Sequence, residues 1–179
     1  MKIFVFMVTL CAFFTAHAAS SESEALALNK SYPIQIYMGA CVASRAVQEQ
    51  VADQARSQGF ALASETLAGN YLQGHEGMVW VSENEHGRFA IASQNRGLCS
   101  VFIHQGNPQE LIESMESWLP PEGSGFTFEK EVVAESEQLL TLSYDIYRDS
   151  RPLERWVITV SKQPGSELIA VMSYDSAQT

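Results

Sequence analysis

Short β-rich segments separated by turn-forming residues constrain the fold of this chain more than any other feature. Three such segments run over 78–81, 88–93 and 98–104, and the residues between them are rich in Asn, Glu and Gly. Apolar segments joined by short turns of this composition predict neighbouring antiparallel strands. We therefore expect residues 78–104 to form a three-stranded antiparallel meander.

A second group of strands is predicted after residue 125. Apolar residues alternate with other residues over four segments: 126–132, 140–146, 156–160 and 168–174. Turn-forming residues at 148–152 and 163–166 separate the last three of them. Runs of strands without regular helical crossovers indicate an α+β fold with a largely antiparallel sheet, on which N-terminal and central helices pack.

The N-terminal helix of this fold is predicted over 42–58. Alanine and valine recur there every four residues, from Ala43 to Ala55, so that one stripe of the helix is apolar. Gly59 is placed to end the helix. Upstream, Pro33 is expected to break any helical structure in the small, polar segment that precedes it.

Capping residues predict two further helices. Ser64 can cap a short helix that reaches about residue 71. Asn107 can accept hydrogen bonds from the first N–H groups of a central helix, and Pro108 fits its first position. The apolar stripe expected on that helix consists of Leu111, Ile112, Met115, Trp118 and Leu119.

Residues 1–18 have the pattern of a secretory signal peptide. Lys2 makes the start positive, 3–15 is almost wholly apolar, and Ala16-His17-Ala18 has small residues where a signal peptidase requires them. The apolar run is too short to span a bilayer. We therefore expect cleavage after Ala18, a periplasmic or secreted protein, no membrane insertion, and one α+β domain over 19–179.

The cysteines favour a single disulfide. Cys11 falls in the signal segment; lipid attachment there is the alternative, but Leu10 stands where a small residue is wanted. Cys41 and Cys99 remain, and an even pair in an exported chain predicts a bridge between them. Two free thiols or a redox pair are the alternative, which the absence of C-x-x-C spacing disfavours.

The negative net charge of the chain disfavours two classes of partner, and three arginines form a cluster of the opposite charge. The chain has a formal net charge of −10, which repels nucleic acid and anionic lipid head groups. Within this acidic background, Arg148, Arg151 and Arg155 gather near a predicted hairpin end. Arginines so placed can dock an acidic partner, whereas charge balance with Asp149 and Glu154 is the alternative interpretation.

Four residues at one edge of the meander are candidate metal ligands. His86 and His104 are predicted at the same end of adjacent strands, and Glu83 and Glu85 lie in the same loop as His86. Solvated turn residues are the alternative. No H-E-x-x-H motif is present, and Gly123-Ser124-Gly125 precedes a strand instead of the helix that a nucleophile elbow needs, so no cofactor is expected.

The chain resembles a family of small exported proteobacterial proteins of unknown function. The residues that carry the resemblance are Cys41-Val42-Ala43, Gly77-Met78-Val79-Trp80 and Gly97-Leu98-Cys99-Ser100-Val101. These motifs are structural, chiefly the cysteine pair and turn glycines. The resemblance therefore implies a shared fold over most of 19–179 and assigns no catalytic residue.

The leading functional hypothesis is a non-enzymatic protein that binds another envelope protein, as an inhibitor or an immunity-type factor. One alternative is a hydrolase or metal-dependent enzyme acting on an envelope substrate, which needs the two histidines to converge. The other is a small-ligand carrier, which needs a cavity between helix and sheet. The aromatic residues that would either fill the core or line such a cavity are Tyr37, Trp80, Trp118, Tyr144, Trp156 and Tyr174.

Overall fold

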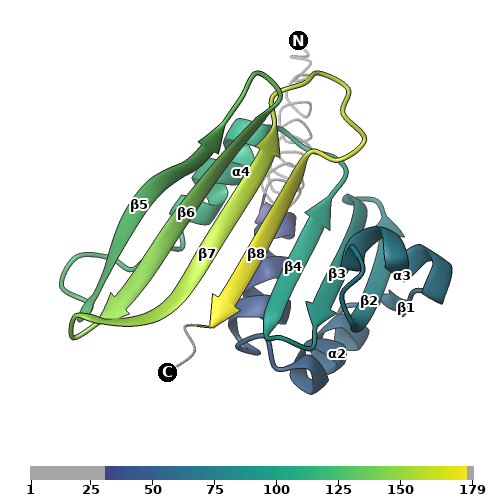
Figure 1. The fold of residues 1–179 in the computed structure, drawn as a ribbon, viewed down its shortest axis with the longest axis horizontal. Coiled ribbons are helices and arrows are strands. Elements are labelled where there is room, and N and C mark those ends of the chain that lie inside the picture. The colour runs from purple at the N-terminus through teal and green to yellow at the C-terminus, as the bar shows by residue number, and fades with distance from the viewer. Residues whose placement is uncertain (1–30, 177–179) are drawn as a thin grey trace, which may run out of the picture.

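The computed structural model describes residues 31–176. Within that part, eight strands form one antiparallel sheet with helices packed on it, which is the α+β class expected from the sequence (Figure 1). The expected signal peptide, 1–18, lies outside the described residues. None of the described helices is both long and apolar enough to cross a membrane.

The sheet joins two groups of sequential hairpins in the order β1-β2-β3-β4-β8-β7-β6-β5. The last strand returns to the middle of the sheet, where β8 pairs with β4 and unites the two groups. The strands are β1 (Ala61–Leu62), β2 (Gly77–Asn84), β3 (Gly87–Gln94), β4 (Leu98–Ile103), β5 (Phe126–Glu135), β6 (Leu139–Arg148), β7 (Arg151–Ser161) and β8 (Ala170–Ser176). Strand β1 has only two residues and was not predicted, because so short a segment shows no alternation.

Helices cover the two faces of the sheet unequally. The π-helical turn η1 (Met38–Val42), helix α2 (Gln48–Ser57) and helix α4 (Pro108–Glu116) contribute to the main core on one face. Helix α3 (Glu65–Leu72) packs on the other face, over a small cluster that includes Val79 and Phe102. Figure 1 shows α3 in front of β2 and β3, whereas no described helix covers β5–β8 on that face.

The predicted helix over 42–58 is shorter than expected. The chain leaves η1 through Arg45 and Ala46, which both have positive φ, and α2 starts only at Gln48. The hydroxyl of buried Ser44 donates to the carbonyl of Ala40, so a side chain competes with the regular helical ladder at this point. The helix ends as predicted, with Gly59 in the left-handed region at φ +80°.

Residues 31–37 are helical, so the described part of this helix includes Pro33. The segment that Pro33 was expected to interrupt, 19–30, lies outside the described residues. Ile34, Ile36 and Tyr37 are buried in the main core, and the burial of these three large side chains stabilises the helix.

The predicted caps of α3 and α4 are confirmed. The Oγ of Ser64 accepts a hydrogen bond from the Leu67 N–H at 3.4 Å. The Oδ1 of Asn107 accepts from the Gln109 and Glu110 N–H groups at 2.9 and 3.3 Å. The apolar stripe of α4 ends early, however, because the helix ends at Glu116 and leaves Trp118 in the following turn with 49% of its surface exposed.

Cys41 and Cys99 form a disulfide, as predicted from the sequence. Their Cα atoms lie 5.3 Å apart, and both side chains are fully buried. The bridge joins η1 to β4 near the middle of the sheet and closes a segment with a sequence separation of 58. It therefore fixes the N-terminal helical segment to the strand that links the two groups of hairpins.

Candidate functional site

A row of polar side chains crosses the end of the meander on the face that α3 covers. Glu83 and Arg88 are partners across the β2–β3 hairpin, and the His104 N–H donates to the Arg88 carbonyl from the end of β4. Side chains on one face of a strand recur every second residue. Because Ala90 and Phe102 belong to the cluster under α3, Arg88 and His104 lie on that same face.

The imidazole of His104 is held between three elements. Its Nδ1 lies 2.8 Å from the Glu167 carbonyl oxygen, which can only accept, so this nitrogen carries the proton and donates. Its Nε2 lies 3.4 Å from the hydroxyl oxygen of Tyr71 on α3. The Arg88 guanidinium lies 3.4 Å from the imidazole, beside Nδ1. This arrangement fixes the ring at the floor of a cleft.

The α3 cleft, as we call it, is bounded by α3, the ends of β2–β4 and the loop before β8. It has a volume of about 570 Å³, within the range of small-molecule sites. Its polar lining includes Glu83, Arg88 and Glu167 besides Tyr71 and His104. Its apolar lining includes Leu67, Val81, Phe102 and Leu168.

The four candidate metal ligands do not assemble into one group. His86 stacks on Tyr32, with ring centroids 4.4 Å apart, and Tyr32 packs against the main core on the other face of the sheet. His104 contacts Tyr71 on the α3 face, and Glu85 lies 3.6 Å from His86. Among residues 31–176, no three His, Cys, Asp or Glu side chains are grouped so as to hold a metal ion.

The three arginines of the predicted partner-binding cluster have different environments. Arg155 makes two hydrogen bonds to Asp145 across the β6–β7 pair, at 2.6 and 2.9 Å, and these bonds raise the pKa of its guanidinium. The guanidinium of Arg148 lies over the ring of Phe126 at 5.5 Å. Arg151 is exposed opposite Arg148 at the hairpin end. Of the three, only Arg148 is paired with a residue of β5, namely Phe126, whereas Arg151 and Arg155 lie on β7.

Five of the six candidate aromatic residues are buried in the main core, and Trp118 is the exposed exception. Glu154, to which the alternative interpretation gave the role of balancing the arginines, accepts hydrogen bonds from Tyr174 and Trp156 at 2.9 and 3.1 Å. Burial, followed by the nearby Glu154 carboxylate, raises the pKa of Tyr174. These aromatics therefore stabilise the core and do not line the α3 cleft.

The second unusual surface is strand β5. It is the last strand of the sheet, so among the described residues only one of its edges is paired. Every β5 residue except Phe126 is exposed. Val132 and Val133 are 54% and 55% exposed, and the pairing register shifts around Val133. A long edge strand presents unpaired backbone N–H and C=O groups to which another chain can add, and exposed apolar side chains on it mark a candidate contact surface.

Contacts from helix α4 hold β5 in place near its middle. The carboxylate of Glu116 accepts from the Lys130 ammonium at 2.5 Å and from the Tyr144 hydroxyl at 2.7 Å. Partial burial acts to raise the pKa of Glu116, but the hydrogen bonds from Lys130 and Tyr144 outweigh it, so that pKa lies below its ordinary value. Glu116 thus links α4 to both strands of the edge hairpin.

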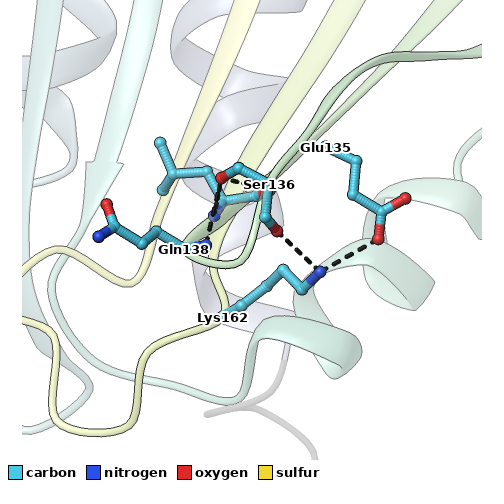
Figure 2. A network of polar contacts seen from close by, with 5 residues as sticks. Glu135, Ser136, Gln138 and Lys162 are labelled. Carbon is cyan, nitrogen blue, oxygen red and sulfur yellow. Dashed lines mark hydrogen bonds and ion pairs between the residues drawn. The ribbon is translucent and has the colours of Figure 1, made fainter.

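A second set of contacts holds the far end of β5. Figure 2 shows Lys162, from the loop after β7, reaching the turn between β5 and β6. Its ammonium donates to the Glu135 carboxylate at 3.1 Å and to the Ser136 carbonyl at 2.9 Å. The Ser136 hydroxyl accepts from the Gln138 and Leu139 N–H groups, which closes the turn. The edge strand is therefore ordered before any partner arrives.

Replacing Glu116 with Gln is expected to lower the free energy of unfolding by roughly 0.5–1 kcal/mol at pH 7, the range for partly exposed ion pairs. Because the folded pKa of Glu116 is lowered, its contribution is present above the pKa of the unfolded chain and is lost as pH falls through the folded value. Urea unfolding of both proteins from pH 7 down to pH 3 measures this. If the difference in unfolding free energy between the two proteins stays constant over that range, the proposed role of Glu116 is contradicted. Glu122→Gln, in an exposed loop, is the control.

Sequence reasoning identified Glu83 and His104 but missed their neighbour Arg88. The missing information was the register: Asn84 pairs with Gly87, so the hairpin turn consists of Glu85 and His86. Once that two-residue turn is fixed, Arg88 must lie opposite Glu83. A two-residue loop is the commonest hairpin connection, so the sequence between Asn84 and Gly87 could have indicated that Glu83 and Arg88 lie opposite each other.

Two surfaces of the described chain are thus candidates for function: the α3 cleft and the edge of β5. Comparisons with protein-family models, with curated proteins and with solved structures yield no match for this chain.

Proposed function

We propose that this chain is an exported, non-enzymatic protein that binds another envelope protein through the edge of β5. The observation that carries the proposal is an ordered ten-residue edge strand that is exposed on nearly its whole length. A partner segment that adds as a further strand would bond to the unpaired backbone groups of β5. Because the strand is held by Glu116 and Lys162, little conformational entropy is lost on binding.

The two faces of β5 specify the chemistry of the partner segment. Phe128 and Val132 lie on the face toward α4, with Lys130 between them already bound to Glu116. Glu129 and Glu131 lie on the opposite face, where Glu129 accepts from the Tyr147 hydroxyl at 3.3 Å. A complementary strand has apolar residues next to the first pair and lysine or arginine next to the second.

One neighbouring residue extends this surface. Arg148 is paired with Phe126 at the start of β5, and its guanidinium can bind a carboxylate at the end of the partner segment. Of the three arginines predicted to bind a partner, Arg148 remains in the proposal, whereas Arg151 lies on β7, two strands from β5, and Arg155 is held by Asp145.

We further propose a cellular location and a role for the protein. The signal-peptide pattern of 1–18 supports export to the periplasm, an oxidising compartment in which the Cys41–Cys99 bridge would persist. An inhibitor or immunity-type factor is the role we propose, because such factors act by occupying a partner and need no catalytic group. Membership of the family of small exported proteobacterial proteins stays a prediction.

A peptide-binding measurement tests the proposal. A peptide of alternating valine and lysine is expected to bind the purified protein, as followed by fluorescence anisotropy, at least about tenfold more tightly than one of alternating valine and glutamate. N-methylation of alternate backbone nitrogens in the valine–lysine peptide, on the edge that would meet β5, should abolish binding, because it removes the hydrogen bonds that a strand addition makes. Equal binding of all three peptides would refute strand addition at this edge.

A further inference from the structure

The α3 cleft contains an arginine without an ion-pair partner. Within residues 31–176, no carboxylate oxygen lies within 4.0 Å of the Arg88 guanidinium. Arg56, Lys130, Arg155 and Lys162 are each paired with a carboxylate, whereas Arg45, Arg148 and Arg151 have no ion pair within the described residues. Of the arginines without such a pair, Arg88 is the one that lines the α3 cleft. In a chain with 21 acidic residues and 11 basic ones, an arginine that lines a cleft and has no carboxylate partner favours an anionic ligand.

Other groups in the α3 cleft restrict the size and charge of that anion. Leu67, Phe102 and Leu168 supply apolar walls, and the ring of Tyr71 packs edge-on against Phe102 at 4.9 Å. Glu83 and Glu167 are exposed and also line the cleft. Their negative charges disfavour a ligand with several anionic groups.

We propose that the α3 cleft binds a small molecule that carries one carboxylate on an apolar body. The carboxylate lies against Arg88 and accepts a hydrogen bond from the Tyr71 hydroxyl, which turns from the long contact with His104. The apolar body lies against Leu67, Phe102 and Leu168. This site is separate from β5, so it stands or falls independently of the proposed protein partner.

The test uses three related probes and isothermal titration calorimetry on the purified protein. Phenylpropanoate is expected to bind saturably at millimolar concentration or below, whereas the neutral phenylpropanamide and the dianion phenylsuccinate should bind roughly tenfold or more weakly. The amide tests the need for a charge, because one charge-assisted hydrogen bond accounts for about a tenfold difference. Equal binding of the acid and the amide, or no saturable binding of phenylpropanoate, would overturn the proposal.

Variants locate the site. Arg88→Gln should weaken phenylpropanoate binding by roughly tenfold or more, and Tyr71→Phe by a smaller factor, without change in the unfolding midpoint. Arg56→Gln removes an equal charge from α2 on the other face of the sheet, where Arg56 pairs with Asp53, and should leave binding unchanged. An equal loss in Arg88→Gln and Arg56→Gln would show that the acid responds to net charge alone and would refute the site.

Discussion

Replacing Cys41 and Cys99 together with serine is expected to lower the free energy of unfolding by about 4 kcal/mol. The bridge spans a sequence separation of 58, and closing a loop of that length restricts the unfolded chain by about this amount in the loop-entropy model. For a domain of this size, that loss corresponds to a decrease in the unfolding midpoint of roughly 8–16 °C. Thermal unfolding followed by circular dichroism measures it.

Reducing the disulfide in the protein of unchanged sequence separates the effect of losing the cross-link from the effect of the two serine side chains. Both cysteines are fully buried, so serine at these positions also buries two hydroxyls, which adds to the loss. Reduction removes the cross-link alone. We expect reduction to account for most of the decrease; an unchanged midpoint in both experiments would show that the bridge does not stabilise the fold.

Reversing the charge of β5 is expected to reverse its preference between peptides. With Glu129→Lys and Glu131→Lys combined, the valine–lysine peptide should bind roughly tenfold or more weakly, and the valine–glutamate peptide should become the tighter ligand. Both side chains are exposed, so the change in folding stability should be within about 1 kcal/mol. Fluorescence anisotropy with both peptides measures the exchange of preference.

The control for this reversal places the same change of net charge elsewhere. Glu49→Lys combined with Glu122→Lys alters two exposed acidic residues outside β5. If binding depends on pairing with β5, this control keeps the preference of the unchanged protein. A control that shifts the preference as much as the β5 variant would show that the peptides respond to total charge.

Local chemistry made much of the fold predictable. Asn107 and Ser64 cap helices because their side chains accept from nearby N–H groups, and this depends on few neighbours. Gly59 ends α2 for an equally local reason. The helical state of Pro33 was not predictable, because it depends on burial of Ile34 and Ile36 against strands far away in the sequence.

The candidate surfaces were harder to predict than the fold. Alternation in 126–132 predicted a strand correctly, but an edge position depends on the strand order of the whole sheet, in which β8 returns to β4. For the α3 cleft, the sequence identified His104 and Glu83, whereas His86 lies in the two-residue turn between β2 and β3 and contacts Tyr32 on the opposite face.

Hydrogen–deuterium exchange across residues 126–135, with and without the valine–lysine peptide, tests the central claim most directly. In the unbound protein, the amides on the unpaired edge of β5 should exchange rapidly while those bonded to β6 are protected. The account predicts that the peptide slows exchange of the rapidly exchanging set, and that protection is concentrated in β5. Unchanged exchange over 126–135 at saturating peptide, or protection confined to another segment such as α3, would contradict it.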